Sequence, residues 1–243
     1  MILETAAELR AIALTASDAS GFFPALYSRV TSRIGAAIAD GTFADGPALD
    51  GFATRFATYY VDAHRDPSRR PRSWKAAWDV ADDPNLLIVQ HLLLGINAHV
   101  NHDLALAVVA AADERGDLLS IRPDFDAVND VLAATYPDIV ADLDRVSRWV
   151  NRVARLGADR AFHFSLLRAR AQAWSAATRI HPLGADARRD AAAELDRVVP
   201  VLSYLITKPP LVLRPLFGLA RRLEERDVAT VVHAMLDEDP DLG

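Results

Sequence analysis

The chain has 243 residues, of which 51% are apolar, enough for one sizeable core but short for two domains. Its net charge of −6 comes from 27 basic and 33 acidic residues spread along the whole length, which disfavours a nucleic-acid partner. The sequence has no cysteine, which excludes disulfides and thiolate sites, and its first residues lack the pattern of a secretory signal. We therefore expect a cytoplasmic protein.

Helical periodicity dominates the chain, and glycine and proline fall mostly between the apolar-periodic segments. The pattern predicts an all-α, single-domain helical bundle over 1–243, built around one long buried helix. Within it, 207–243 is either packed or a peripheral C-terminal extension. The predicted helices are 3–16, 20–40, 46–64, 72–81, 84–114, 124–134, 137–156, 159–180, 185–207 and 211–237, the last of them broken.

Two segments combine bases with prolines. The stretch 65–72 is expected to be a solvated connector, with a lid or an anion-binding rim as the alternative. The stretch 208–222 mixes apolar residues with bases, as a membrane-surface helix does. Its three prolines and the acidic Glu224 and Glu225 that follow favour a packed C-terminal helix instead, and we expect no stable membrane insertion.

The segment 84–114 carries the clearest helical signal. Asp83 followed by Pro84 is a typical helix start, and Gly116 supplies a stop. Except in its last turn, the only formally charged residue of this segment is Asp103. A helix that is apolar nearly all round must be buried in the centre of the fold, and its polar residues make it a poor membrane span.

One face of this central helix carries a row of polar residues. At about 100° per residue, an arc of roughly 120° contains His91, Gly95, His99, His102 and Asp103. Gly95 leaves a notch where a ligand, a water or another backbone can approach, since glycine within a helix costs about 1 kcal/mol relative to alanine and needs a reason. We expect His91, His99 and Asp103 to face one interior cavity rather than solvent.

His99 and Asp103 stand one helical turn apart, and two chemistries fit this spacing. An imidazole and a carboxylate so placed can share a metal ion such as Zn²⁺ with ligands from elsewhere. They can equally form a hydrogen-bonded pair in which the carboxylate fixes the tautomer of the ring. His91 lies roughly 12 Å along the helix axis, which assigns it to another subsite. The candidates for a third metal ligand are His163, Asp124, Asp62 and His64.

The helix expected around residue 170 supplies a further candidate. Its apolar stripe places Arg170 on the same face as His163 and Trp174, so the guanidinium can point inward. A buried arginine normally requires a carboxylate, and Asp103 or Asp124 would serve. For Asp124 the simplest role is to cap the helix that follows it.

The run from Gln90 to Leu104, together with Asp124, Phe125, Asn129 and the stretch from Arg170 to Trp174, resembles a bacterial family catalogued only as a domain of unknown function. The likeness extends over about residues 20–180 and implies an all-helical fold. Membership of this family implies no particular reaction. Its pattern carries over onto His91, Asn97, His99 and Asp103, and with them Arg170 and Trp174.

More distantly, His99 and Asp103 are similar to the His-x-x-x-Asp metal-ligand motif of zinc-dependent phospholipase C-like proteins and single-strand nucleases. The chain lacks the secretory signal and the N-terminal tryptophan of that group, and it has no His-x-x-x-Glu motif. The resemblance therefore implies at most a reduced metal site.

Three functions remain open. In a metal-assisted hydrolase, His99 and Asp103 hold Zn²⁺ or another divalent metal. His91 or His102 then shuttles protons. In a metal-free lyase, isomerase or cyclase, the His99–Asp103 pair is the general base for a small apolar substrate and Arg170 holds an anionic group. In a non-catalytic helical protein the polar row binds a ligand or fixes helix register. A small-molecule ligand is the expected partner.

Overall fold

The computed structural model describes residues 1–150, 159–208 and 210–236, and this part of the chain is all-α, as predicted. Within these residues there is no strand, only an isolated bridge between Ser147 and Glu224. The helices are α1 (Ile2–Thr15), α2 (Phe22–Ala39), α3 (Gly46–Arg65), α4 (Arg72–Trp78), α5 (Ile88–Ala98), α6 (Leu104–Arg115), α7 (Arg122–Val146), α9 (Asp159–Ile180), α10 (Ala185–Thr207), α11 (Arg214–Arg221) and α12 (Val228–Met235).

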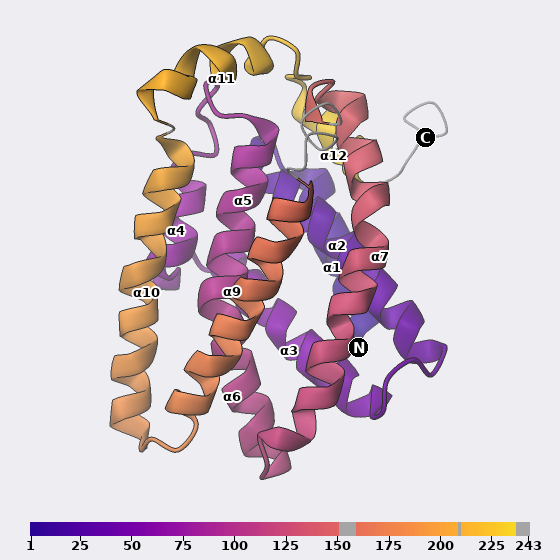
Figure 1. The fold of residues 1–243 in the computed structure, drawn as a ribbon, viewed down its shortest axis with the longest axis vertical. Helices are drawn as coiled ribbons and strands as arrows, with labels where there is room; N and C mark the ends of the chain where they lie inside the picture. Colours follow the sequence, from indigo (N-terminus) through magenta and orange to yellow (C-terminus); the bar gives the residue numbers. More distant parts are fainter. Residues whose placement is uncertain (151–158, 209, 237–243) are drawn as a thin grey trace.

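A continuous helix made of α5, the π-helical turn His99–Asp103 and α6 runs through the middle of the bundle (Figure 1). It ends at Gly116, whose φ of 71° lies in the left-handed region that glycine adopts without strain, as predicted. Among the described helices this one is long and apolar enough to cross a membrane, but 72% of its most apolar stretch is buried inside the fold. The central buried helix is therefore confirmed.

The central helix begins at Ile88, and the predicted start at residue 84 lies in a turn. Two side chains cap the observed start. The side-chain oxygen of Gln90 accepts a hydrogen bond from the backbone N–H of Leu87 at 2.9 Å. The carboxylate of Glu224 accepts one from the N–H of Ile88 at 3.1 Å. Because Glu224 is 136 residues away in the chain, local sequence signals could not locate this start.

The helix α7 replaces two predicted helices, 124–134 and 137–156, and it continues through Pro137. A proline inside a helix removes a backbone donor and costs about 3 kcal/mol, which is why the sequence predicted a break. In the structure α7 packs against α2 and α12, and these contacts compensate for the lost donor. The predicted stretch 151–156 lies outside the described residues.

The connector 65–72 is held against its neighbours. The guanidinium of Arg70 lies 3.9 Å from the ring centroid of Trp78, and its Nε donates to the carbonyl oxygen of Ala63 at 2.9 Å. At the start of α4, the carboxylate of Asp196 on α10 accepts hydrogen bonds from two successive backbone N–H groups. These contacts tie the connector to α3, α4 and α10.

The segment 208–222 differs from the prediction of a packed C-terminal helix. Ala220 faces the bundle and is buried, but Leu211, Val212 and Leu216 are 74%, 82% and 60% exposed. The predicted break between residues 211 and 237 is confirmed, since α11 and α12 are separate helices. The packing prediction was wrong because Leu211, Val212, Leu216 and Leu219 are exposed to solvent rather than packed on the core.

Gly95 marks a close approach between the central helix and α2. A Cβ atom at this position would lie 2.5 Å from two ring carbons of Phe23. The notch that the sequence predicted is therefore filled by an aromatic side chain, not by a ligand.

We expect Gly95→Ala to lower the free energy of unfolding by about 1–3 kcal/mol, because the added methyl group must displace a buried ring. Gly51→Ala in α3 is the matched control, since a Cβ there meets nothing within 4 Å. The control should stabilise the protein by up to about 1 kcal/mol through helix propensity. Urea denaturation measures both, and a stabilising effect of Gly95→Ala would contradict the close contact.

Candidate active site

The carboxylate of Asp103 lies at the centre of the bundle, with its side chain 1% exposed. The indole Nε1 of Trp74 donates to its Oδ2 at 2.8 Å. The Nδ1 atoms of two imidazoles lie at hydrogen-bond distance, His99 from Oδ2 at 3.0 Å and His102 from Oδ1 at 2.7 Å. Three partners thus surround one buried charge, and the predicted pairing of His99 with Asp103 is present in the structure.

The π-helical turn gives this cluster its geometry. It spans His99 to Asp103, so both histidines and the carboxylate come from one widened turn between α5 and α6. Isolated π-helical turns inside α-helices occur frequently at functional sites. Trp74 reaches the carboxylate from α4, which packs against α5. The cluster therefore depends both on the local turn and on the position of a neighbouring helix.

The imidazole of His99 is enclosed by aromatic rings. The ring of Phe56 stacks on it with centroids 3.6 Å apart and planes 10° apart. The ring of Tyr27 meets it edge-on at 4.5 Å, and Phe23 does so at 5.6 Å. Its Nε2 is buried and has no hydrogen-bond partner among the described residues. Among the described residues, it is the one fully buried polar side-chain atom of this cluster without a partner.

Burial and hydrogen bonding set the protonation of the pair. Burial lowers the pKa of His99 below its ordinary value, and the nearby Asp103 offsets only part of that effect. For Asp103, burial alone would raise the pKa, but the hydrogen bonds from His102 and His99 outweigh it and the pKa is lowered. At neutral pH the carboxylate is therefore ionised and His99 is neutral. Its Nδ1 then carries the proton toward Asp103, and Nε2 holds a free lone pair.

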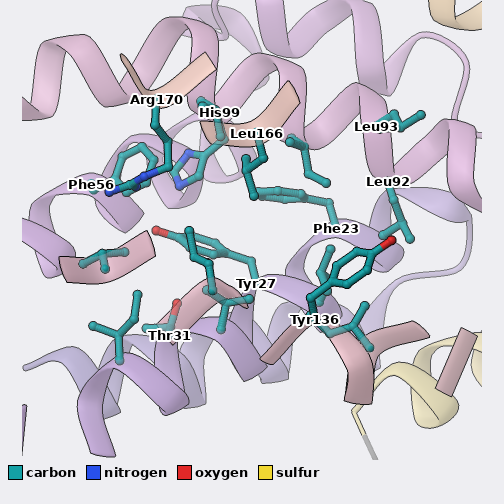
Figure 2. A pocket seen from close by; sticks show the side chains of 18 of the residues that line it. Phe23, Tyr27, Thr31, Phe56, Leu92, Leu93, His99, Tyr136, Leu166 and Arg170 are labelled. Carbon is teal, nitrogen blue, oxygen red and sulfur yellow. The ribbon is translucent and has the colours of Figure 1, made fainter. Parts of the chain in front are cut away.

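His99 lines a cavity of about 270 Å³ between α2, α3, α5, α7 and α9. Figure 2 shows the side chains around it, with Arg170 and His99 entering on the same side, next to Phe56. Most of the lining is aliphatic or aromatic, which makes the space suitable for an apolar molecule. The side chains in this lining that carry polar atoms are Tyr27, Thr31, His99, Tyr136, Trp149 and Arg170.

Arg170 is buried at the cavity wall, as predicted, but it does not pair with Asp103. Its Nε donates to Oδ1 of Asn129 and its Nη2 to the carbonyl oxygen of Phe125, both at 2.6 Å. Burial lowers the pKa of Arg170 to about 10, so the group remains a cation at neutral pH. Among the described residues, no carboxylate lies within ion-pair distance of Arg170. Its two hydrogen-bond acceptors are neutral, and the negative Asp126 offsets only part of the effect of burial on the pKa of Arg170.

Two polar residues of the row lie away from this cavity. His91 packs its ring edge-on against Phe22, with centroids 6.0 Å apart. His102 binds Asp103 from the other side, and neither histidine is among the described residues that line the cavity. The expectation that His91, His99 and Asp103 all face one cavity was therefore wrong. Only His99 opens onto it.

The remaining candidate ligands do not gather around His99. The carboxylate of Asp124 accepts hydrogen bonds from the backbone N–H groups of Ala44 and Asp45, so the expected cap of its own helix is replaced by a contact with the loop before α3. His64 stacks on Tyr60, and Asp62 is exposed. The side chain of His163 lies outside the described part of the chain.

These residues do not fit the metal site that the sequence suggested. The oxygens of Asp103 already face Trp74, His99 and His102 at hydrogen-bond distances. No group of three histidine, aspartate or glutamate side chains with metal-binding geometry occurs in the described residues. The Nε2 of His99 has no hydrogen-bond partner among the described residues, and the cavity that this residue lines is mostly apolar.

Sequence reasoning missed the wall of the cavity that α2 provides. Phe23, Tyr27 and Thr31 all line it, and they are spaced four residues apart along one face of that helix. Burial raises the pKa of the Tyr27 hydroxyl, and the negative Asp103 adds to that rise, so the phenol stays protonated. The four-residue spacing was a usable signal, but any core helix shows the same spacing.

Comparison with known proteins adds a family and no chemistry. A model described as a family of unknown function (DUF5995) matches residues 2–209. No curated protein and no solved structure matches the chain.

We expect Asp103→Asn to lower the free energy of unfolding by about 1–3 kcal/mol for each buried donor that it leaves without an acceptor. The amide keeps one acceptor oxygen but turns an NH₂ group toward a partner that is itself a donor. Leu94→Ala, at a fully buried position of the same helix, should cost about 2–5 kcal/mol and serves as a core reference. Denaturation midpoints equal to those of the wild type would show that the cluster does not hold the bundle together.

A pH dependence is expected from His91, because burial lowers its pKa from 6.5 to about 4. The unfolded chain takes up a proton at this residue below its ordinary pKa, whereas the folded chain does so only near pH 4. Stability should therefore fall as the pH drops from 6.5 to 4, by up to an amount on the order of 3 kcal/mol. Urea unfolding of the wild type and His91→Gln at pH 7 and pH 5 measures it. An equal loss in both proteins would refute this assignment.

Proposed function

Because the chain belongs to the family of unknown function DUF5995, its function has to be inferred from the site, and we propose a metal-free enzyme that uses His99 as a general base. Its substrate is a small, largely apolar molecule bound in the cavity. The observation that carries the proposal is the buried, unpartnered Nε2 of His99 at the wall of an apolar cavity.

A general base needs a free lone pair at the operating pH and a fixed orientation. The lowered pKa of His99 keeps the ring neutral at physiological pH. The carboxylate of Asp103 holds the opposite nitrogen at 3.0 Å, and the stacked ring of Phe56 fixes the plane of the imidazole. When Nε2 takes up a proton, the adjacent anionic Asp103 stabilises the resulting imidazolium.

Leaving Nε2 without a partner costs free energy in a folded protein. A buried polar atom that lacks a hydrogen bond destabilises the fold by about 1–3 kcal/mol. A purely structural network would be expected to satisfy this atom, as it satisfies both oxygens of Asp103. A bound molecule that donates a hydrogen bond or gives up a proton to Nε2 removes the penalty.

Besides a base, such an enzyme needs a group that stabilises the negative charge of the deprotonated substrate, and Arg170 supplies it. Proton removal from a small organic molecule leaves an anion, and a buried guanidinium stabilises that charge strongly in an apolar cavity. The two neutral acceptors of Arg170 orient its plane without neutralising it. The substrate class that fits is an apolar molecule with one carboxylate, enol or phenol-like oxygen, and the reaction class is that of an isomerase or lyase.

A nitrobenzisoxazole is a suitable probe, because its ring opens when a base removes one C–H proton. His99 takes that proton, the electron pair of the C–H bond forms the nitrile, and the N–O bond breaks to leave a yellow phenolate. We expect the protein to accelerate this reaction and His99→Gln to reduce the enzymatic rate by about 100-fold or more. The rate should rise with pH and reach a plateau below neutrality, because the pKa of His99 is lowered.

Two controls make the result specific. His181→Gln, at a histidine whose side chain is 28% exposed and pairs with Asp113, should leave the rate unchanged. Decanoate should compete with the probe, and its inhibition should weaken in Arg170→Met but persist in Arg170→Lys. Binding of the probe without ring opening would favour a ligand-binding protein over an enzyme. A rate that survives in His99→Gln would overturn the proposal.

A further inference from the structure

A second feature of the molecule lies on its outside, along the C-terminal half of α10 and over α11. Ten of the sixteen large apolar side chains that are exposed in the described residues fall between 198 and 223. We call this surface the α10–α11 face. Its members are Val198, Val201, Leu202, Tyr204, Leu205, Leu211, Val212, Leu216, Leu219 and Leu223.

The two helices display these residues away from the bundle. On α10 the exposed residues recur at three- and four-residue intervals, whereas Val199 and Ser203 on the opposite side are buried against α4 and α5. On α11, Leu216 and Leu219 are exposed, whereas Ala220 is buried. Figure 1 shows α10 along one edge of the bundle and α11 across its end. An exposed apolar surface of this extent marks an interaction site.

The charged residues between 198 and 223 are of one sign. Between residues 198 and 223 the sequence contains no acidic residue, although the whole chain has a net charge of −6. Its basic residues are Lys208, Arg214, Arg221 and Arg222. An interaction partner must therefore be both apolar and negatively charged.

A cleft of about 640 Å³ adjoins the face, between the start of the central helix and α11. Arg221 is fixed there by a hydrogen bond from its Nε to the carbonyl oxygen of Pro84 at 2.8 Å. The cleft is large enough for a phosphate-containing group. The charged residues among those that line it are Asp83, Lys208, Arg214, Arg221, Arg222 and Arg226.

We propose that the α10–α11 face docks on the surface of a bilayer that contains anionic phospholipids. Aliphatic side chains enter the acyl boundary, while the exposed Lys208, Arg214 and Arg222 meet the phosphate groups, as in interfacial amphipathic helices. A second copy of the chain fits the face less well, because a two-fold interface would bring the four bases of each copy together. Docking leaves the central helix inside the bundle, where most of its apolar stretch is buried.

Sedimentation with lipid vesicles tests this proposal. The full chain should bind vesicles of phosphatidylcholine with phosphatidylglycerol at least 10-fold more tightly than vesicles of phosphatidylcholine alone, and high salt should weaken the binding. The double variant Leu216→Glu, Leu219→Glu should lose binding to both. The double variant Arg214→Glu, Arg222→Glu should lose the preference for anionic lipid. All four residues are exposed, so the fold should be retained.

Matched variants at other exposed positions are the controls. Leu119→Glu, at a side chain 70% exposed, and Arg189→Glu, at one 72% exposed, should bind vesicles as the wild type does. Equal loss in these controls would overturn the proposal, as would absence of binding to either vesicle. Two further outcomes also overturn it: a dimer that dissociates in the Leu216→Glu, Leu219→Glu variant, or stabilisation by inorganic phosphate without vesicle binding.

Discussion

The burial of the Asp103 carboxylate is the constraint on which the centre of the structure depends. A charge in the middle of a bundle costs several kcal/mol unless hydrogen bonds compensate it. Trp74 from α4 and two histidines of the π-helical turn provide them, so the position of α4 and the shape of the turn are fixed together. The same contacts orient His99. Its Nδ1 faces Asp103, and its Nε2 is left buried and without a hydrogen-bond partner among the described residues, which is the basis of the proposed reactivity.

A second buried carboxylate, that of Glu224, organises the start of the central helix. Burial raises the pKa of Glu224, and its oxygens accept hydrogen bonds from the N–H of Ile88, the hydroxyl of Ser147 and the indole of Trp149. Trp149 lines the cavity, whereas Arg221, one turn before Glu224, lines the basic cleft. Glu224 therefore contacts one residue that lines the interior cavity and one that lines the cleft beside the α10–α11 face. The two proposals share a physical basis, because a molecule that favours an apolar cavity also partitions into lipid.

Local patterns were sufficient for the fold class and for the central helix. A helix with almost no charged residues, such as 84–114, must be buried, whatever elements surround it. The contact between His99 and Asp103 was likewise predictable, since residues one turn apart meet in any helix. Gly116 ends the helix for a similarly local reason, its left-handed backbone conformation. These features depend on residues that are close in the chain.

The tertiary structure decided which partners these residues meet. Arg170 donates hydrogen bonds to Asn129 and Phe125 on α7. It does not pair with Asp103, which the sequence had offered as its partner. The ring of Phe23 fills the notch at Gly95. The cavity itself exists only because faces of α2, α3, α7 and α9 meet the central helix without filling the space between them. The sequence by itself determined the all-helical class, the buried central segment and the His–Asp pair, because those follow from spacing within a helix. Which helix faces which, and so where the cavity lies, depends on packing between distant segments that no local pattern encodes.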